Sequence, residues 1–147
     1  MSTFQPEGVN IEFNGETRNL LFDYSVIEKI QEKYEAHPIV VINNMFWDYK
    51  DDDGNVFPNY RAKNVIDLTY FLINAEVERR RFYDGSTDLR KYTREEVGHV
   101  ITRQNDNAIA GAIVQAWTGS IPEPDPEDVE EDDEDTDPEV KKKKQKS

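Results

Sequence analysis

An acidic cluster at residues 48–55 has the composition of a calcium-binding loop, with the sequence DYKDDDGN. Such a loop needs oxygen ligands at positions 1, 3, 5 and 12 and glycine at position 6. Placing Gly54 at position 6 puts Tyr49 at position 1 and Tyr60 at position 12, and neither residue is a carboxylate. The calcium-loop register therefore fails. We predict an exposed acidic loop without a metal site, and weak cation binding by the clustered acids is the alternative left open.

Other residue types that could do chemistry lack partners at the required spacing. His37 and His99 are the only two imidazoles, and neither has a second ligand at metal-binding spacing. The sequence contains neither a Gly-x-Ser-x-Gly nucleophile elbow nor a glycine-rich phosphate loop. Glu95 and Glu96 are adjacent on a predicted helix, so their side chains diverge and do not share a site. We therefore predict that the chain is not an enzyme and binds no cofactor.

Basic and aromatic residues point instead to protein binding. The run Arg79-Arg80-Arg81 lies in an acidic chain and could dock an acidic segment, on a partner or in this chain's own tail. The alternative is a solvated helix end, where the helix dipole favours cations. Aromatic residues near the predicted loops suit protein interfaces. The candidate partner-binding residues are Trp47, Phe57, Tyr60, Arg79, Arg80, Arg81, Tyr83 and Tyr92.

Composition argues against several other classes of protein. There is no cysteine, so disulfides and thiolate chemistry are excluded. A pI near 4.5 argues against sequence-independent nucleic-acid binding, which needs a basic face. The longest apolar runs are far shorter than the roughly 20 residues that span a bilayer, and residues 1–8 hold no signal-like apolar core. We expect a chain that binds neither nucleic acid nor membrane.

The acidic charge is concentrated at the C-terminal end. Residues 120–147 hold twelve acids and five lysines, a net charge of −7 out of the total of −13. The remaining −6 belongs to residues 1–119. Four prolines and few aliphatic residues in this segment predict disorder, because it cannot bury enough apolar surface to offset the entropy of ordering. The expected organisation is a flexible N-terminus at 1–8, one globular domain at 9–119 and a disordered tail at 120–147.

Sequence periodicity predicts an N-terminal hairpin followed by a helix. Apolar residues alternate along residues 9–13, and Asn14-Gly15 suits a type I′ turn, which places the return strand at 16–22. Ser25 with Glu28 forms a predicted capping box for the next helix, and Asp23 is a competing N-cap. The helix is expected to end before Pro38, because proline disfavours the α region for the residue preceding it.

The rest of the globular segment is predicted to be helical. Residues 39–47 could form a helix or a strand, and we favour a helix because two adjacent asparagines fit poorly within a strand. A loop is expected at 48–60. Further helices are predicted at about residues 62–82, from a capping box at Thr93, and from Asn105 or Asp106 to Gly119. The expected fold is α+β and mostly helical, with an N-terminal β-hairpin packed on four or five helices.

The order of these elements resembles the tail assembly chaperones of long-tailed (siphovirus-type) bacteriophages. The matching segments lie within residues 8–118, and they are IEFNG at 11–15, LFDY at 21–24, VIEKIQEKY at 26–34, LTYFLIN at 68–74 and YTREEVGHVI at 92–101. The acidic loop at 48–60 and the arginine run at 79–81 depart from the family's pattern.

The resemblance implies a function in virion assembly. Proteins of this family coat the long, helix-rich tape measure protein in the host cytoplasm, keep it soluble and help tail tube protein polymerise around it. They are late proteins that are absent from the mature virion. Many also have a longer form made by ribosomal frameshifting near the end of the gene. Lys141, Lys142, Lys143 and Lys144 fall where such a slip would occur, although they also suit a tail whose lysines partly balance its acids.

Two other functions compete with the chaperone interpretation. An acidic mimic of nucleic acid, such as an anti-restriction inhibitor, would explain the net charge of −13. However, a mimic displays its acids on a rigid surface, whereas the densest acid here lies in the predicted disordered tail. An antitoxin-like regulatory domain would bind one globular partner. The sequence also leaves open whether the chain forms a homo-oligomer.

Overall fold

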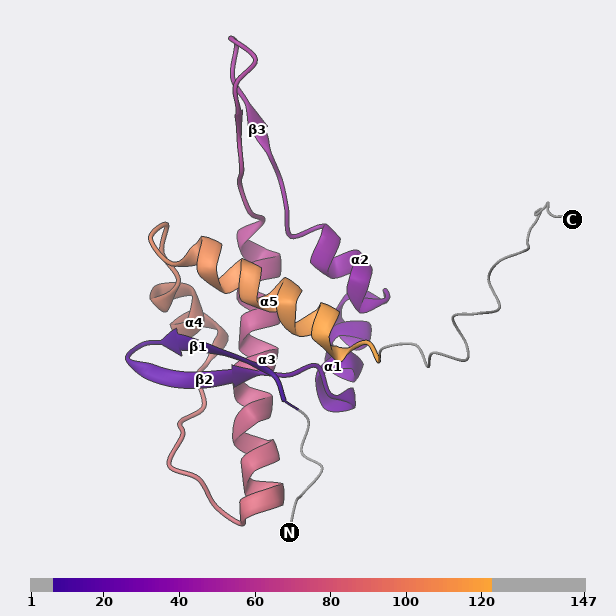
Figure 1. Ribbon diagram of the computed structural model, residues 1–147, viewed down its shortest axis with the longest axis vertical. Helices are drawn as coiled ribbons and strands as arrows, with labels where there is room; N and C mark the ends of the chain where they lie inside the picture. The colour runs from indigo at the N-terminus through magenta and orange to yellow at the C-terminus, as the bar shows by residue number, and fades with distance from the viewer. Residues whose placement is uncertain (1–6, 123–147) are drawn as a thin grey trace, which may run out of the picture.

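A computed structural model describes residues 7–122 of the chain, and the fold is α+β, as predicted. The residues described form an N-terminal β-hairpin, five helices and a second, very short hairpin (Figure 1). Residues 1–6 and 123–147 lie outside this part of the chain. The predictions of a flexible N-terminus, a disordered acidic tail and a frameshift region at Lys141–Lys144 therefore fall wholly or largely outside the described residues.

The N-terminal hairpin forms at the predicted turn. Strands β1 (Val9–Phe13) and β2 (Glu16–Leu20) pair antiparallel, with Phe13 opposite Glu16. Asn14 and Gly15 have φ angles of 54° and 80°, the two positive values that a type I′ turn requires. β2 is shorter than expected, because its pairing with β1 ends at Leu20.

Helix α1 (Tyr24–Tyr34) begins at the competing cap rather than at the predicted one. The Asp23 carboxylate accepts a hydrogen bond of 3.1 Å from the Val26 N–H. Ser25 is not the N-cap, because it lies inside the first turn and its hydroxyl donates to Asp23 at 2.6 Å. The expected capping box at Ser25 is therefore wrong, and Asp23 satisfies the free end of the helix.

Four further helices form at or near their predicted positions. Helix α2 (Pro38–Asn43) confirms the helical interpretation of the segment after His37 but ends four residues before the predicted end at residue 47. Helix α3 (Ala62–Asp84) is the longest, and α4 (Arg94–Val100) has the full capping box between Thr93 and Glu96. Helix α5 (Asp106–Ser120) follows Asn105 and runs one residue beyond the expected end at Gly119.

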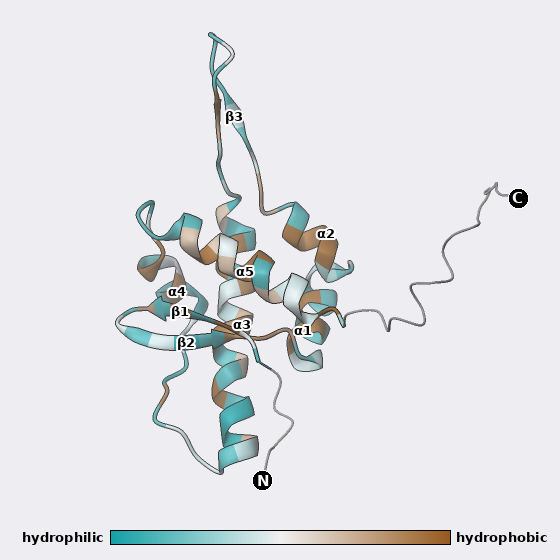
Figure 2. Cartoon of the chain, in the orientation of Figure 1, coloured by the Kyte–Doolittle hydropathy of each residue, from teal (hydrophilic) through white to brown (hydrophobic). Residues whose placement is uncertain are grey.

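The core lies between the hairpin and helices α1, α3 and α5. β2 packs on α3 and β1 on α5, while α1 and α4 flank α3. Figure 1 shows α3 running along the length of the molecule with α5 crossing it. The core side chains are mostly aliphatic, including Leu20, Ile30, Leu68, Leu72 and Ile113. The C-terminal turns of α3 extend past this core, where Figure 2 shows mainly hydrophilic residues.

Candidate protein-binding site on a projecting aromatic arm

Residues 46–60 form a hairpin arm that projects from one end of the body, where the end of a helix at 46–47 and a loop at 48–60 were predicted (Figure 1). Strands β3 (Tyr49–Lys50) and β4 (Val56–Phe57) pair antiparallel, with Tyr49 opposite Phe57. The same register continues to the bridge between Phe46 and Tyr60 at the root of the arm. None of residues 46–60 is buried. The arm is thus an ordered ribbon outside the core, and the prediction of a plain loop is wrong.

One face of the arm is aromatic. Side chains alternate between the two faces of a strand, so Trp47 and Tyr49 share a face with Phe57, the cross-strand partner of Tyr49. Trp47 is 58% exposed, Tyr49 55% and Phe57 48%. The rings of Tyr49 and Phe57 stack with centroids 6.1 Å apart. We call these three residues the aromatic face.

The root of the arm is fixed to the body by several contacts. The Arg61 N–H donates to the Met45 carbonyl at 2.8 Å, which closes the base of the ribbon. The Phe46 and Tyr60 rings lie 5.7 Å apart, and the Arg61 guanidinium lies 5.0 Å from the centre of the Trp47 ring. The Tyr60 hydroxyl donates to the Asn107 side chain on α5. These contacts set the direction in which the arm projects.

The tip of the arm is a three-residue turn organised by Asp51. Its carboxylate accepts hydrogen bonds from the Asp53 N–H at 3.0 Å and the Asn55 N–H at 2.8 Å. Gly54 has a φ of 88°, a left-handed conformation that glycine adopts without strain. The hydrogen bonds from Asn55 and Asp53 hold the pKa of the Asp51 carboxyl below its usual range. The acidic sequence thus has a structural explanation, and residues 7–122 contain no cluster of three or more metal-ligand side chains.

The charge at the tip is unbalanced within the described chain. Asp51, Asp52 and Asp53 make no ion pair with any residue between 7 and 122. Lys50 precedes them on the face opposite the aromatic residues, because it pairs with Val56. Figure 2 shows a hydrophilic tip beyond a hydrophobic stretch of the arm. We call residues 51–53 the acidic tip.

A groove of about 410 Å³ lies beside the root of the arm. Tyr60 lines it together with Ile66 of α3 and Ile101 and Arg103, which follow α4. Tyr60 also contacts Phe46, so the apolar surface continues from the groove to the root of the arm.

Two of the predicted arginines are occupied by contacts within the body. Arg79 donates to the Asn19 side chain at 3.0 Å and lies 3.5 Å from the Asp23 carboxylate. Arg80 pairs with Glu76 at 3.2 Å and lies 4.0 Å from Asp84. The contacts of Arg79 hold the hairpin, the start of α1 and the end of α3 together, whereas both ion pairs of Arg80 lie within α3. Arg79 and Arg80 thus have a structural role, which weakens their assignment as a docking point.

Tyr92 is buried and therefore does not lie on the candidate surface. Its side chain is 3% exposed, and its ring packs edge to face on Phe13 at 5.1 Å. Its hydroxyl donates to the Glu16 carboxylate at 2.9 Å. The prediction of Tyr92 as a partner-binding residue is therefore wrong. Its place in the sequence, between a polar loop and a capping box, gave no sign that the ring packs under the hairpin turn.

The end of α3 carries the remaining candidates. Arg81 is exposed and Tyr83 is half-exposed, and beside them Phe82 is 80% exposed. Neither Phe82 nor Tyr24, which is 85% exposed at the start of α1, was among the residues predicted from the sequence. Figure 1 places the end of α3 and the arm at opposite ends of the molecule. The predicted site residues therefore do not form one surface.

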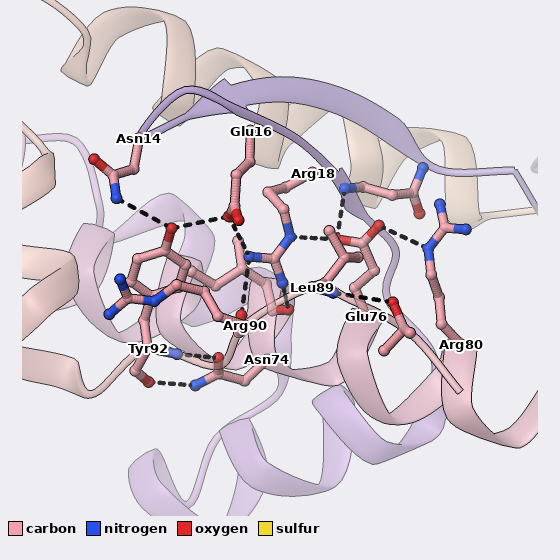
Figure 3. A network of polar contacts seen from close by, with 12 residues as sticks. Asn14, Glu16, Arg18, Asn74, Glu76, Arg80, Leu89, Arg90 and Tyr92 are labelled. Atoms are coloured by element: carbon pink, nitrogen blue, oxygen red, sulfur yellow. Dashed lines mark hydrogen bonds and ion pairs between the residues drawn. The ribbon is translucent and has the colours of Figure 1, made fainter. Parts of the chain in front are cut away.

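A buried ion pair that joins the hairpin to α3 was not predicted from the sequence. Arg18, fully buried on β2, donates through Nε to Glu76 at 2.8 Å and through Nη2 to the Ile73 carbonyl at 2.6 Å (Figure 3). Glu76 also accepts from the Asn19 N–H at 3.0 Å. Every polar atom of this pair has a partner, so we assign it to the fold and not to ligand binding. The sequence could have indicated this burial, because Arg18 lies two and four residues from Leu20 and Phe22 and so shares their face of an alternating strand.

No helix in the described range of 7–122 is both long and apolar enough to cross a membrane. Comparison with protein-family models, curated proteins and solved structures finds no match for this chain.

Proposed function

We propose that this protein is a bacteriophage tail assembly chaperone, which binds the tape measure protein, keeps it soluble and promotes polymerisation of the tail tube. The observation that carries the proposal is the aromatic face of the arm, where Trp47, Tyr49 and Phe57 are each about half exposed. The resemblance of residues 8–118 to such chaperones supports the same function. The proposed setting is the host cytoplasm, and the proposed role ends before the virion is mature.

The arm suits a client-binding role for a physical reason. An isolated two-stranded hairpin is at best marginally stable in water, and about half of the surface of these aromatic side chains stays exposed in the free protein. Covering them with another polypeptide removes apolar surface from water, which favours association. The surface is small, so each contact is weak, and tube subunits can displace it. A long client with exposed apolar stripes would bind many copies.

The net charge of the chain fits a role in keeping the client soluble. A client coated with many copies stays in solution only if the coated complexes repel each other. Each copy carries a net charge of −13, and strong net charge of one sign opposes association between complexes. We therefore assign solubilisation to the charge of the chain and recognition of the client to the arm.

Co-expression with a fragment of the tape measure protein from the same genome tests this function. The fragment is expected to sediment when expressed alone and to stay in the supernatant with the full chain. The variant Trp47→Ser/Phe57→Ser should lose this protection. Its matched control, Phe82→Ser/Tyr83→Ser, removes two exposed aromatics from the far end of α3 and should retain it.

Two results would contradict the proposal. The first is a fragment that sediments equally with and without the chain. The second is a genome that contains no tape measure gene near the gene for this protein. An acidic inhibitor of a nucleic-acid enzyme would instead lower cleavage by that enzyme, with no effect on sedimentation of the fragment.

A further inference from the structure

We infer that the arm selects a basic amphipathic helix, whose apolar stripe covers the aromatic face and whose Lys or Arg side chains reach the acidic tip. This inference rests on the proposed function, because it specifies which segments of the client are bound.

The order of side chains along one strand gives the arm a direction. Trp47, Tyr49 and Asp51 occupy alternate positions, so they follow one another on one face from the root to the tip. Phe57 lies beside Tyr49 on the second strand. A ligand lying along this face meets two layers of aromatic surface and then carboxylates. The complementary ligand is apolar at one end and basic at the other.

The spacing of these layers matches a helix. Residues two apart on a strand are separated by about 6.7 Å, whereas residues four apart on a helix rise by about 6.0 Å. Apolar residues at i and i+4 of a client helix can therefore contact Trp47 and Tyr49 in succession. Position i+8, about 12 Å from i, then lies near Asp51. The expected client motif is apolar at i and i+4, with Lys or Arg near i+8.

The charge at the tip decides which helices bind. The tip carries three carboxylates, at Asp51, Asp52 and Asp53, and none is in an ion pair within residues 7–122. The turn hydrogen bonds to Asp51 favour its ionised form, as its lowered pKa indicates. An acidic helix would be repelled by this charge, and a basic helix would be attracted to it. Charge of this kind acts mainly on specificity and on the rate of association.

The direct test uses the full chain and two labelled peptides of about 20 residues, long enough to form a helix. The first peptide repeats Leu at i and i+4 and Lys at i+8, and the second has Glu in place of each Lys. Fluorescence anisotropy is measured at low salt and at about 0.5 M NaCl. The Lys peptide should bind at least about tenfold more tightly at low salt, and the difference should shrink at high salt because exposed charges are screened.

Paired variants separate the tip from the overall acidity of the chain. Asp52→Asn/Asp53→Asn should weaken binding of the Lys peptide by about threefold to tenfold, in line with two exposed ion pairs. Glu28→Gln/Glu32→Gln removes the same charge from the exposed side of α1 and should change binding by less than about twofold. Trp47→Ser/Phe57→Ser should weaken binding further, with a far-UV circular dichroism spectrum like that of the unmodified chain.

Several outcomes would overturn the inference. Equal binding of both peptides, or an equal effect of the tip and α1 variants, would mean that the tip does not select the ligand. Binding without a gain of helical dichroism would indicate an extended ligand paired to the edge of the arm. A dimer in sedimentation that Trp47→Ser/Phe57→Ser abolishes would make a second copy the occupant of the arm.

The same assays distinguish failure of the inference from failure of the proposed function. If the tape measure fragment is protected but the tip variant protects it equally well, the charge selection is wrong and the chaperone role stands. If the Lys peptide binds as expected but the fragment sediments regardless, the chaperone role is wrong and the arm has a different helical ligand.

Discussion

Arg18 is the largest side chain that is fully buried, and its charge is acceptable there only because it is completely paired. Nε contacts Glu76, Nη2 contacts the Ile73 carbonyl, and Nη1 lies 3.2 Å from the Arg90 carbonyl. A buried ion with all its hydrogen bonds satisfied offsets its desolvation, whereas an unpaired one does not. The pair therefore ties β2 to α3 at one specific position.

Removing one partner should be far more harmful than replacing both. Glu76→Ala removes the buried counter-ion of Arg18 and leaves only the partly exposed Glu16 carboxylate, 3.3 Å from Nη1. We expect a loss of about 3 kcal/mol in the free energy of unfolding. The double variant Arg18→Met/Glu76→Leu removes both charges and keeps similar volume, so it should lose less. Urea unfolding of the three proteins measures this. A double variant at least as destabilised as Glu76→Ala would contradict the account.

At the residue scale, the burial of Arg18 could have been predicted from the sequence, but the N-cap of α1 and the burial of Tyr92 could not. Arg18 lies two residues from Leu20 on an alternating strand, so the period of the strand placed it on the inner face. Asp23 and Ser25 were both good N-cap candidates. Local sequence could not decide between them, because the choice depends on where the preceding strand ends. Burial of Tyr92 depends on its contact with Phe13, which is far away in sequence.

At the scale of elements, most of the helices were predictable and the arm was not. The capping box at Thr93, the Asn14-Gly15 turn and the apolar stripes are local signals, and each gave the right element. The arm was interpreted as a loop because its turn residues dominate and each strand has only two residues. Its pairing depends on the root contacts of Phe46, Tyr60 and Arg61, which local patterns do not reveal.

The arm should be separable from the fold. Replacing residues 48–58 with Asn-Gly keeps the Met45–Arg61 hydrogen bond and removes no buried side chain. We expect the midpoint of thermal unfolding to change by less than about 4 °C, equivalent to about 1 kcal/mol or less for a domain of this size. Circular dichroism at 222 nm during heating measures this. A collapse of the helical signal at room temperature would show instead that the arm supports the core.

At the scale of the whole molecule, Asp67 joins three helices. Its carboxylate accepts from Tyr34 at 2.5 Å, Lys33 at 3.3 Å and Arg94 at 2.5 Å, which connects α3 to α1 and α4. Burial alone would raise the pKa of Asp67, but the hydrogen bonds from Tyr34, Arg94 and Lys33 outweigh it and hold the pKa below the usual range. In the same cluster, burial first and then the nearby Asp67 raise the pKa of Tyr34.

This cluster makes global stability depend on pH with a definite sign. The pKa of Asp67 is lower in the folded chain than its unfolded value of about 3.9. The unfolded state therefore binds more protons in acid, and stability rises with pH. The stabilisation is fully present above about pH 5 and is lost as the pH falls through 3.9 towards the lower folded pKa.

Comparing the unmodified chain with Asp67→Asn isolates the contribution of Asp67 to the pH dependence of stability, because other carboxyls with lowered pKa values, such as Glu78 and Glu96, are common to both proteins. At pH 7 the variant should be less stable by about 2–3 kcal/mol, since Lys33 and Arg94 lose their shared counter-ion. Urea unfolding between pH 7 and pH 3 should show the difference between the two proteins shrinking below about pH 5. A difference that stays constant over this range would mean that the pKa of Asp67 is the same in the folded and unfolded states, which would contradict this account.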